Sequence, residues 1–245
     1  MRATLCRFLS MAGLMAPGLV SAATAPAKEA GDEPVEIVRT VDIEYPTKLA
    51  VRHIDEGEVR AVIWVDETGR LLDWLLVGAS HPLFAKEVLD VLPKWRYLPA
   101  YRQGRPVCGR VEIRASFKSE GFFQIKSGVP EMTAADNRPA AGQVGTVPRI
   151  YNPDELDQPL DPVVEITPES PEKLGAVATQ GKVIVEYLID SEGKVRMPIV
   201  TSSDDDAFTN SVLLAISEWR YAVPMHTGRP VVARARREFT FSPAS

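Results

Sequence analysis

Histidine and cysteine are scarce in this chain, which narrows the chemistry that it can perform. Its 245 residues include three histidines (His53, His81 and His226) and two cysteines. No Ser/His/Asp, Cys/His or paired-carboxylate arrangement accompanies these residues, and no phosphate-binding loop or dinucleotide fingerprint is present. We therefore expect a protein that is not an enzyme, with no catalytic residue and no cofactor.

Long apolar runs are also missing, except at the N terminus. There Arg2 and Arg7 precede an apolar stretch at 8–20, and small residues follow at 21–23. The stretch is shorter than the ~20 residues that span a bilayer, and its layout is typical of a secretory signal peptide. We expect a cleaved signal peptide and a periplasmic mature chain that does not span the membrane. A retained N-terminal anchor is the alternative.

Cleavage would remove Cys6 and leave Cys108 as the only cysteine. An intrachain disulfide would then be excluded, while an interchain disulfide or a buried free thiol would remain. Cys108 lies near the start of an alternating, strand-like stretch. For this reason we favour the buried thiol.

Basic charge is not concentrated in any part of the sequence. The chain holds 28 Lys and Arg against 33 Asp and Glu, for a net charge of −5. Without a basic stripe, nucleic acid is not an expected partner. Acidic residues cluster at 190–192 and 204–206, but the spacing of a calcium loop is absent. We expect no metal site.

The sequence does contain an internal repeat. Trp95-Arg96-Tyr97 returns 124 residues later as Trp219-Arg220-Tyr221, and Gly104-Arg105-Pro106-Val107 returns at the same displacement as residues 228–231. The register holds without a gap from the first turn to the last strand, which indicates a duplicated domain. The expected organisation is a signal peptide, a disordered leader, a first domain, a Pro- and acid-rich linker and a second domain, at 1–22, 23–40, 41–118, 119–164 and 165–242.

Each copy predicts the same order of elements: a short helix, two strands joined by a turn, a longer helix, a loop and a last strand. Asp66–Gly69 and its counterpart are typical hairpin turns. One helical face carries Phe84, Val88, Leu92 and Trp95, and the second copy has apolar residues at all four counterparts. Along the first strand, every second residue is apolar in both copies, and this set is expected to be buried. The residues between them form a variable phase, which differs between the copies and which we expect to be exposed. Trp64 lies on that variable phase, as a partner contact or a lone surface aromatic.

Several single residues carry further expectations. Ser80 and Asp204 are the candidate N-caps of the longer helices, and Pro93 predicts an early end or a bend in the first of them. Pro198 favours an edge strand or a bulge. Arg237 falls on the inward phase of the last strand, which a bulge or an uncovered strand end would explain.

Several motifs resemble the TonB C-terminal domain family. They are Tyr45-Pro46, Gly69-Arg70, Ser80-His81-Pro82-Leu83-Phe84, Trp95-Arg96-Tyr97-Leu98-Pro99-Ala100 and Gly104-Arg105-Pro106-Val107. The second copy retains the Trp-Arg-Tyr and Gly-Arg-Pro-Val motifs but lacks Tyr-Pro and Ser-His-Pro. The resemblance implies an α+β fold of two tandem small domains, each a three-stranded antiparallel sheet packed against two helices.

The resemblance also implies a mode of action. Members of this family bind an extended segment of an outer-membrane transporter as an added strand at an exposed sheet edge. In this chain that edge would be the last strand of each copy. The expected partner-binding residues are Val107, Arg110, Glu112, Arg114, Val231, Arg234 and Arg236. The outward arginines could instead protect an exposed edge from aggregation.

The leading hypothesis is a periplasmic protein-binding module that engages an outer-membrane or other envelope protein, with two sites linked for avidity. Energy-transducing members keep an N-terminal membrane helix, and the Pro-rich stretch of this chain joins two copies of the domain instead. A membrane-anchored energy transducer is therefore the second hypothesis. The third is a structural or assembly factor that forms a homodimer through its edge strands.

Overall fold

The computed structural model describes residues 32–118, 123–128, 147–169 and 180–242. The expected signal peptide and the middle of the linker lie outside the described residues, and so does the counterpart of the first short helix at 170–179. Within the described ranges, no helix combines the length and the hydropathy needed to cross a membrane.

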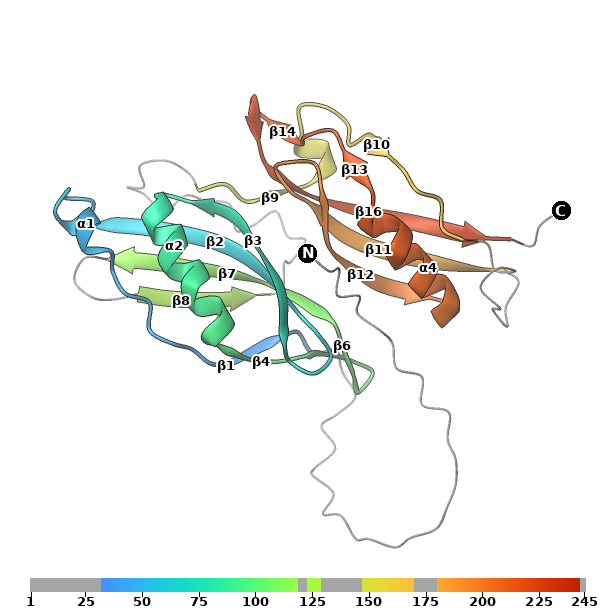
Figure 1. The fold of residues 1–245 in the computed structure, drawn as a ribbon, viewed down its shortest axis with the longest axis horizontal. Coiled ribbons are helices and arrows are strands. Elements are labelled where there is room, and N and C mark those ends of the chain that lie inside the picture. The colour runs from blue at the N-terminus through green and yellow to red at the C-terminus, as the bar shows by residue number, and fades with distance from the viewer. Residues whose placement is uncertain (1–31, 119–122, 129–146, 170–179, 243–245) are drawn as a thin grey trace, which may run out of the picture.

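The first domain is built on one antiparallel sheet in the order β3-β2-β7-β8 (Figure 1). Helix α2 packs on one face of this sheet, with a 3-10 turn at Leu92–Lys94 directly after it. The elements are β1 (Glu36–Arg39), α1 (Thr47–Ala50), β2 (Glu56–Val65), β3 (Leu71–Ala79), α2 (Pro82–Val91), β4 (Arg96–Leu98), β5 (Ala100–Arg102), β6 (Arg105–Val107), β7 (Gly109–Lys118) and β8 (Phe123–Gly128).

The second domain repeats this plan with the sheet order β12-β11-β16-β9. Its elements are β9 (Ile150–Tyr151), a 3-10 turn (Pro153–Glu155), β10 (Pro162–Val164), β11 (Gly181–Ile189), β12 (Val195–Ser203), α4 (Asp206–Ser217), β13 (Arg220–Tyr221), β14 (Met225–His226), β15 (Arg229–Pro230) and β16 (Val232–Phe241). The predicted α+β class with tandem three-stranded antiparallel sheets is confirmed. A fourth strand, β8 or β9, joins the last strand of each.

The two helix-side cores are built from equivalent residues. Phe84 stacks on Phe117 with ring centroids 4.5 Å apart, and Phe208 stacks on Phe241 at 4.4 Å. Each ring lies directly over a strand glycine. A Cβ at Gly57 would lie 2.1 Å from the ring of Phe84, and the counterpart Gly181 gives 2.7 Å to Phe208. The helical face predicted from the repeat is therefore the buried one, and glycine makes room for its phenylalanine.

The hairpin turns are also as predicted. Gly69 and Gly193 have positive φ angles of 83° and 80°, a conformation that glycine adopts without steric cost. A side chain at Gly69 would meet the carbonyl oxygen of Tyr97 at 2.5 Å, and one at Gly193 would meet that of Tyr221 at 2.2 Å. Each turn thus packs on the backbone of its own Trp-Arg-Tyr motif.

The predicted N-caps are wrong by one residue in both copies. His81 and Asp205 cap α2 and α4 by accepting from the backbone two residues ahead. Ser80 instead accepts from the amide of Glu58, and Asp204 from that of Lys182. These two side chains tie the start of each helix to the first long strand of its sheet, so they are not available as caps.

Proline acts as expected at two positions. Helix α2 ends at Val91, and Pro93 lies in the 3-10 turn that follows. Pro198 lies on β12, an edge strand of its sheet, where the register with β11 shifts between Glu186 and Leu188. Arg237 involves no bulge, because β11 and β16 pair without a shift. Its guanidinium lies over the Trp219 ring, 5.6 Å from the centroid, and pairs with Glu165 at 3.3 Å.

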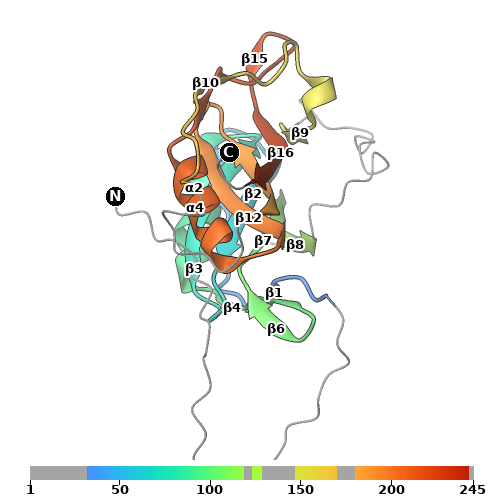
Figure 2. The same cartoon turned by 90° about the vertical axis from the view of Figure 1, so that its right-hand side faces the viewer.

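The faces of the two sheets that carry no helix pack against each other and form a third core. This interdomain core contains Val62, Leu75 and Val77 from the first domain and Ile150, Leu188, Met197 and Val232 from the second. Trp64 packs against it, so this tryptophan belongs to neither of the two expected classes. Pro148 lies against Gly78, where a Cβ would be 2.7 Å from its ring. The variable phase of the strands is therefore an interface within the chain. Figure 2 looks along the two domains, with the second in front of the first.

Candidate functional site

The edge of β7, the last strand of the first domain, is paired with the chain itself. Strand β8 runs antiparallel to β7 from the pair Glu112–Gly128 to the pair Phe117–Phe123. Residues 123–128 of the expected linker therefore belong to the first sheet and cover the edge of this strand. An external strand could join β7 along this stretch only after β8 leaves.

The edge of β16, the last strand of the second domain, is covered only at its start. Strand β9 runs parallel to it and pairs with Val232 and Ala233. Among the described residues, no strand pairs with the outer edge of β16 from Arg234 to Phe241. A groove of about 490 Å³ lies beside this edge, lined by residues that include Leu156, Leu160, Tyr187 and Ala235. The second domain thus offers backbone groups next to a partly apolar groove.

The segment 147–157 holds β9 in place. Arg149 donates two hydrogen bonds to the carboxylate of Glu155, at 3.0 and 2.5 Å, and its guanidinium lies 4.5 Å from the centroid of the Tyr151 ring. Hydrogen bonding by Arg149 holds the pKa of Glu155 down at about 2. The Tyr151 ring lies 4.4 Å from that of His226, and Asp157 accepts hydrogen bonds from the amides at 227 and 228. The expected linker is anchored to the second domain here.

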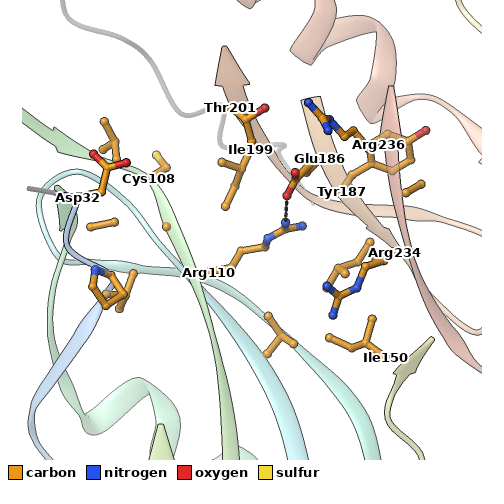
Figure 3. A pocket seen from close by; sticks show the side chains of 18 of the residues that line it. Asp32, Cys108, Arg110, Ile150, Glu186, Tyr187, Ile199, Thr201, Arg234 and Arg236 are labelled. Carbon is orange, nitrogen blue, oxygen red and sulfur yellow. Dashed lines mark ion pairs between the residues drawn. The ribbon is translucent and has the colours of Figure 1, made fainter. Parts of the chain in front are cut away.

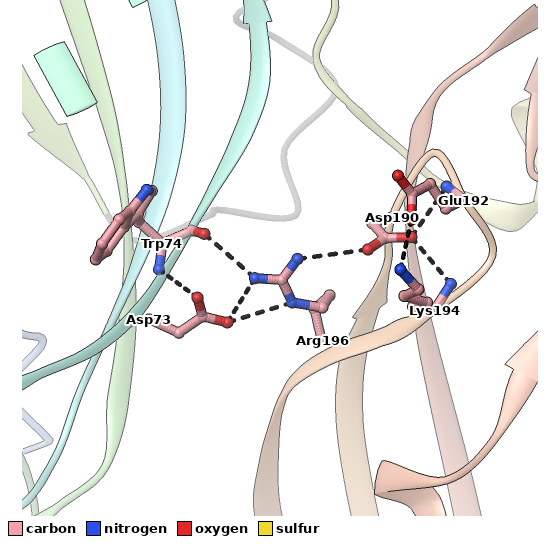
Figure 4. Close-up of polar contacts among 6 residues, drawn as sticks. All are labelled: Asp73, Trp74, Asp190, Glu192, Lys194 and Arg196. Atoms are coloured by element: carbon pink, nitrogen blue, oxygen red, sulfur yellow. Dashed lines mark hydrogen bonds and ion pairs between the residues drawn. The ribbon is translucent and has the colours of Figure 1, made fainter. Parts of the chain in front are cut away.

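Arginine side chains join the two domains around the interdomain core. Arg196 on β12 forms an ion pair with Asp73 on β3 at 2.6 Å and donates to the Trp74 carbonyl (Figure 4). Arg102 donates to the carbonyls of Val200 and Thr201 at 3.0 and 3.1 Å. Because these contacts cross the boundary, they fix the orientation of the two sheets as well as their distance.

A cavity of about 780 Å³ lies between the domains, next to this core (Figure 3). Arg110 enters it from β7, Arg234 from β16 and Glu186 from β11. The guanidinium of Arg110 donates to the Met197 carbonyl at 3.1 Å and lies 3.9 Å from the Glu186 carboxylate. Its side chain is only 11% exposed. The pKa of Arg110 is lowered to about 10, mainly by burial. The charge of Glu186 opposes this shift, and the charge of Arg234 adds to it.

Comparison with known proteins adds a family to this geometry. The family model for the Gram-negative bacterial TonB protein C-terminal domain matches twice, at 41–119 and 167–243. These two matches cover more than half of the chain and contain three of the four strands of each sheet, all but β8 and β9. The chain belongs to the TonB C-terminal domain family.

Individual relatives cover smaller parts. Protein TonB of Vibrio cholerae serotype O1 is 30% identical over 91 residues, which are 37% of this chain and 37% of that protein. The chain thus spans little more than a third of the length of this curated relative. A solution structure of the Pseudomonas aeruginosa TonB C-terminal domain shares 25% identity and covers 35% of this chain and 88% of that one, with a TM-score of 0.31.

The TonB C-terminal domain is a protein-interaction module and not a known enzyme family. The recognition that the motifs suggested is thereby confirmed in both copies. In this TonB-like chain, strand edges, grooves and cavities are consequently the features that can serve recognition.

The structure places the residues expected to bind a partner in three different settings. Glu112 and Arg114 lie on β7 where β8 covers the edge, and they pair with each other at 3.2 Å. Arg110 and Arg234 line the interdomain cavity, as do Val107 on β6 and the exposed Arg236 on β16. Val231 is buried just before β16 and lies outside this lining. The seven residues therefore do not form one surface.

Sequence reasoning missed the residues that join the domains, above all Asp73, Glu186 and Arg196. One signal was available, since apolar residues such as Val62, Trp64 and Leu188 stand on the phase that was expected to be exposed. Cys108 also differs from expectation, because it is disulfide-bonded and not a free thiol. The expectation assumed the removal of Cys6, which lies outside the described residues. Because Cys6 is the only other cysteine of the chain, an intrachain disulfide and cleavage near Ala23 exclude each other.

Proposed function

We propose that this protein binds an extended segment of an envelope protein in the periplasm, by strand addition to β16 of its second domain. The observation that carries the proposal is the uncovered edge of β16 from Arg234 to Phe241 in the described chain. Backbone hydrogen bonds along such an edge supply affinity, and pockets for alternate side chains supply selectivity. The groove beside Ala235 is well positioned to take such side chains.

The two domains have different roles in this proposal. Pairing with β8 already satisfies the edge of β7 from Glu112 to Phe117, so the first domain contributes packing and orientation. Of the two last strands, only β16 leaves most of its outer edge unpaired among the described residues, so we propose one binding edge in place of the two equal sites expected from the repeat. An outer-membrane transporter is the partner class that family membership favours, because the relative from Vibrio cholerae is a TonB protein.

We further propose that the chain is exported and released from its N-terminal signal peptide. The basic residues, the short apolar run and the small residues of positions 1–23 support this. Sequencing the N terminus of the mature protein tests the proposal directly. A start near Ala23 is the expected result, and a retained N terminus would favour a membrane-anchored energy transducer instead.

A crosslinking experiment in intact cells tests the binding edge. Ser116 on β7 and Thr240 on β16 occupy equivalent positions of the repeat, and both are exposed. A photoreactive residue at Thr240 should crosslink to an envelope protein, whereas the same residue at Ser116 should not, since β8 pairs with β7 at that position. Crosslinks from position 116 without crosslinks from position 240 would contradict the proposal and indicate that the partner binds to β7 of the first domain. Crosslinks to a second copy of the chain would identify the homodimer.

A further inference from the structure

The duplication brings two equivalent arginines face to face. Arg110 and Arg234 hold the same position of the repeat, 124 residues apart. Each lies on the helix-free face of its sheet, opposite Trp64 on β2 and Leu188 on β11 respectively. Because the two domains pack through these faces, both arginines line the same interdomain cavity. Two guanidinium groups thereby share a site that water only partly reaches.

The charges of these two arginines are not fully compensated by the described residues. The nearest carboxylate to Arg110 is that of Glu186, at a long 3.9 Å, and no other acid of the described ranges forms an ion pair with either guanidinium. The Nε of Arg234 is buried and has no hydrogen-bond partner among the described residues. A buried donor without a partner is unfavourable. The guanidinium of Arg234 is therefore under-satisfied at the wall of a cavity that its side chain lines.

The remainder of the cavity provides apolar surface and further charges. Val62, Ile150, Leu188 and Ile199 contribute apolar side chains next to the two arginines. Arg102 also lines the cavity, but its guanidinium is bound to the backbone of β12. The other acidic residues of the lining are Asp32, Glu33 and Asp154. Asp32 lies beside Cys108, at the end away from Arg234 (Figure 3).

We propose that the interdomain cavity is a binding site for a small organic carboxylate with an apolar body. Guanidinium groups bind carboxylates in a planar, two-point geometry, and the side chains of Arg110 and Arg234 both line this cavity. The cavity volume of about 780 Å³ falls within the range of small-molecule sites, which combine apolar walls with a few polar groups. Neither inorganic phosphate nor acetate would use the apolar walls. The site adjoins the start of the uncovered edge of β16, with which it shares Arg234, Ala235 and Arg236, and it adds a small ligand to the protein-binding role.

Calorimetric titration of the whole chain with octanoate tests the proposal, with octanol as the uncharged match. Octanoate should bind with a stoichiometry of one and octanol at least ten-fold more weakly. Arg234→Gln should weaken octanoate binding at least ten-fold, and Arg234→Lys should restore part of it by returning the charge. Arg229→Gln removes the same charge from an exposed strand outside the cavity and should bind octanoate as the parent does.

A peptide with a free C-terminal leucine, compared with octanoate, identifies the source of the carboxylate. Tighter binding of the peptide would indicate a protein C terminus, and tighter binding of octanoate a free acid; the carboxylate site stands in both cases. Equal binding of octanoate and octanol would overturn the proposal. So would octanoate binding that Arg234→Gln leaves unchanged in a folded variant, or an absence of saturable binding by both carboxylates.

Discussion

The carboxylate of Asp73 and the guanidinium of Arg196 meet at 2.6 Å across the boundary between the two domains. Arg196 also reaches Asp190, at 3.4 Å, in the turn of its own domain. The side chains of Asp73 and Arg196 are 35% and 28% exposed, so water screens the pair in part. It connects β3 of the first sheet with β12 of the second at one side of the interdomain core.

Replacing Asp73 with Asn should loosen this connection without disturbing either helix-side core. Ion pairs with this degree of exposure contribute about 0.5–1 kcal/mol, and we expect Asp73→Asn to lower the free energy of unfolding by that amount. Denaturant unfolding at low and high salt measures the effect, which should shrink at high salt. Lys86→Gln is the matched control, because its pair with Asp90 lies within one exposed helix face. A larger loss in Lys86→Gln would contradict the expectation.

The close approach of Gly57 to Phe84 predicts a difference between the two copies. A Cβ at Gly57 would lie 2.1 Å from the Phe84 ring, whereas a Cβ at Gly181 would lie 2.7 Å from the Phe208 ring. Overpacking of a core costs about 1–3 kcal/mol, so Gly57→Ala should destabilise the protein more than Gly181→Ala. Thermal unfolding measures both variants. If the clash is the cause, Phe84→Leu should lower the stability less in the Gly57→Ala background than in the parent protein. Additive losses of stability in the double variant would exclude the clash as the cause.

The low pKa of Glu155 makes the attachment of 147–157 sensitive to acid. Hydrogen bonds from Arg149 hold this pKa at about 2 instead of 4.5. A carboxyl with a lowered folded-state pKa stabilises the fold above its unfolded value, and the contribution is lost as the pH falls from about 4.5 towards 2. With the exposure of the pair taken into account, we expect the contribution to be about 1–2 kcal/mol.

Glu155→Gln isolates this contribution. Unfolding free energies at pH 6 and pH 3 should differ less in the variant than in the parent protein, because Gln carries no titrating proton. An NMR titration of the Glu155 carboxyl in the parent protein gives the pKa directly. A midpoint near 4.5 would show that the ion pair with Arg149 does not hold in solution.

The elements that the sequence predicted are those determined by local patterns. Gly69 identifies its turn because few other residues adopt its φ angle, and Phe84 and Trp95 recur on one helical face. The duplication strengthened both predictions, since Gly193, Phe208 and Trp219 stand at the same positions. Helix caps were misplaced by one residue because Ser, Asp and His all accept a backbone hydrogen bond. Which of them does so depends on the neighbouring strand.

The interdomain face could not be predicted in the same way. Val62 and Glu186 are equivalent positions of the repeat, as are Trp64 and Leu188, so the face differs between the copies and shows no shared apolar phase. Arg110 and Arg234 look solvent-exposed in the sequence because arginine is seldom buried. Only the packing of the two sheets shows that they meet. The partners β8 and β9 join through backbone groups, which leave no side-chain pattern to detect.

The pairing of β8 with β7 gives a final prediction about self-association. Ile125 pairs with Ala115 at the middle of this two-stranded contact. Proline at position 125 removes a backbone N–H and fixes φ near about −65°, away from the extended values of an antiparallel strand, so Ile125→Pro should release β8 and expose the edge of β7. An uncovered edge strand readily pairs with another copy of itself.

We therefore expect Ile125→Pro to form dimers or larger species in sedimentation velocity at concentrations where the parent chain is monomeric. Hydrogen exchange should accelerate in β7 around Ala115, while β11 of the second domain keeps its protection and shows that the variant is folded. Because no described strand of the parent chain covers the edge of β16 from Arg234 to Phe241, an exposed edge alone does not ensure dimerisation. Exposed charges at Arg236, Arg237 and Glu238 oppose pairing there. Their counterparts on β7 are the buried Ile113 and the partly buried Glu112 and Arg114, which pair with each other. A monomeric Ile125→Pro variant with accelerated exchange in β7 would show that this charge difference does not control association.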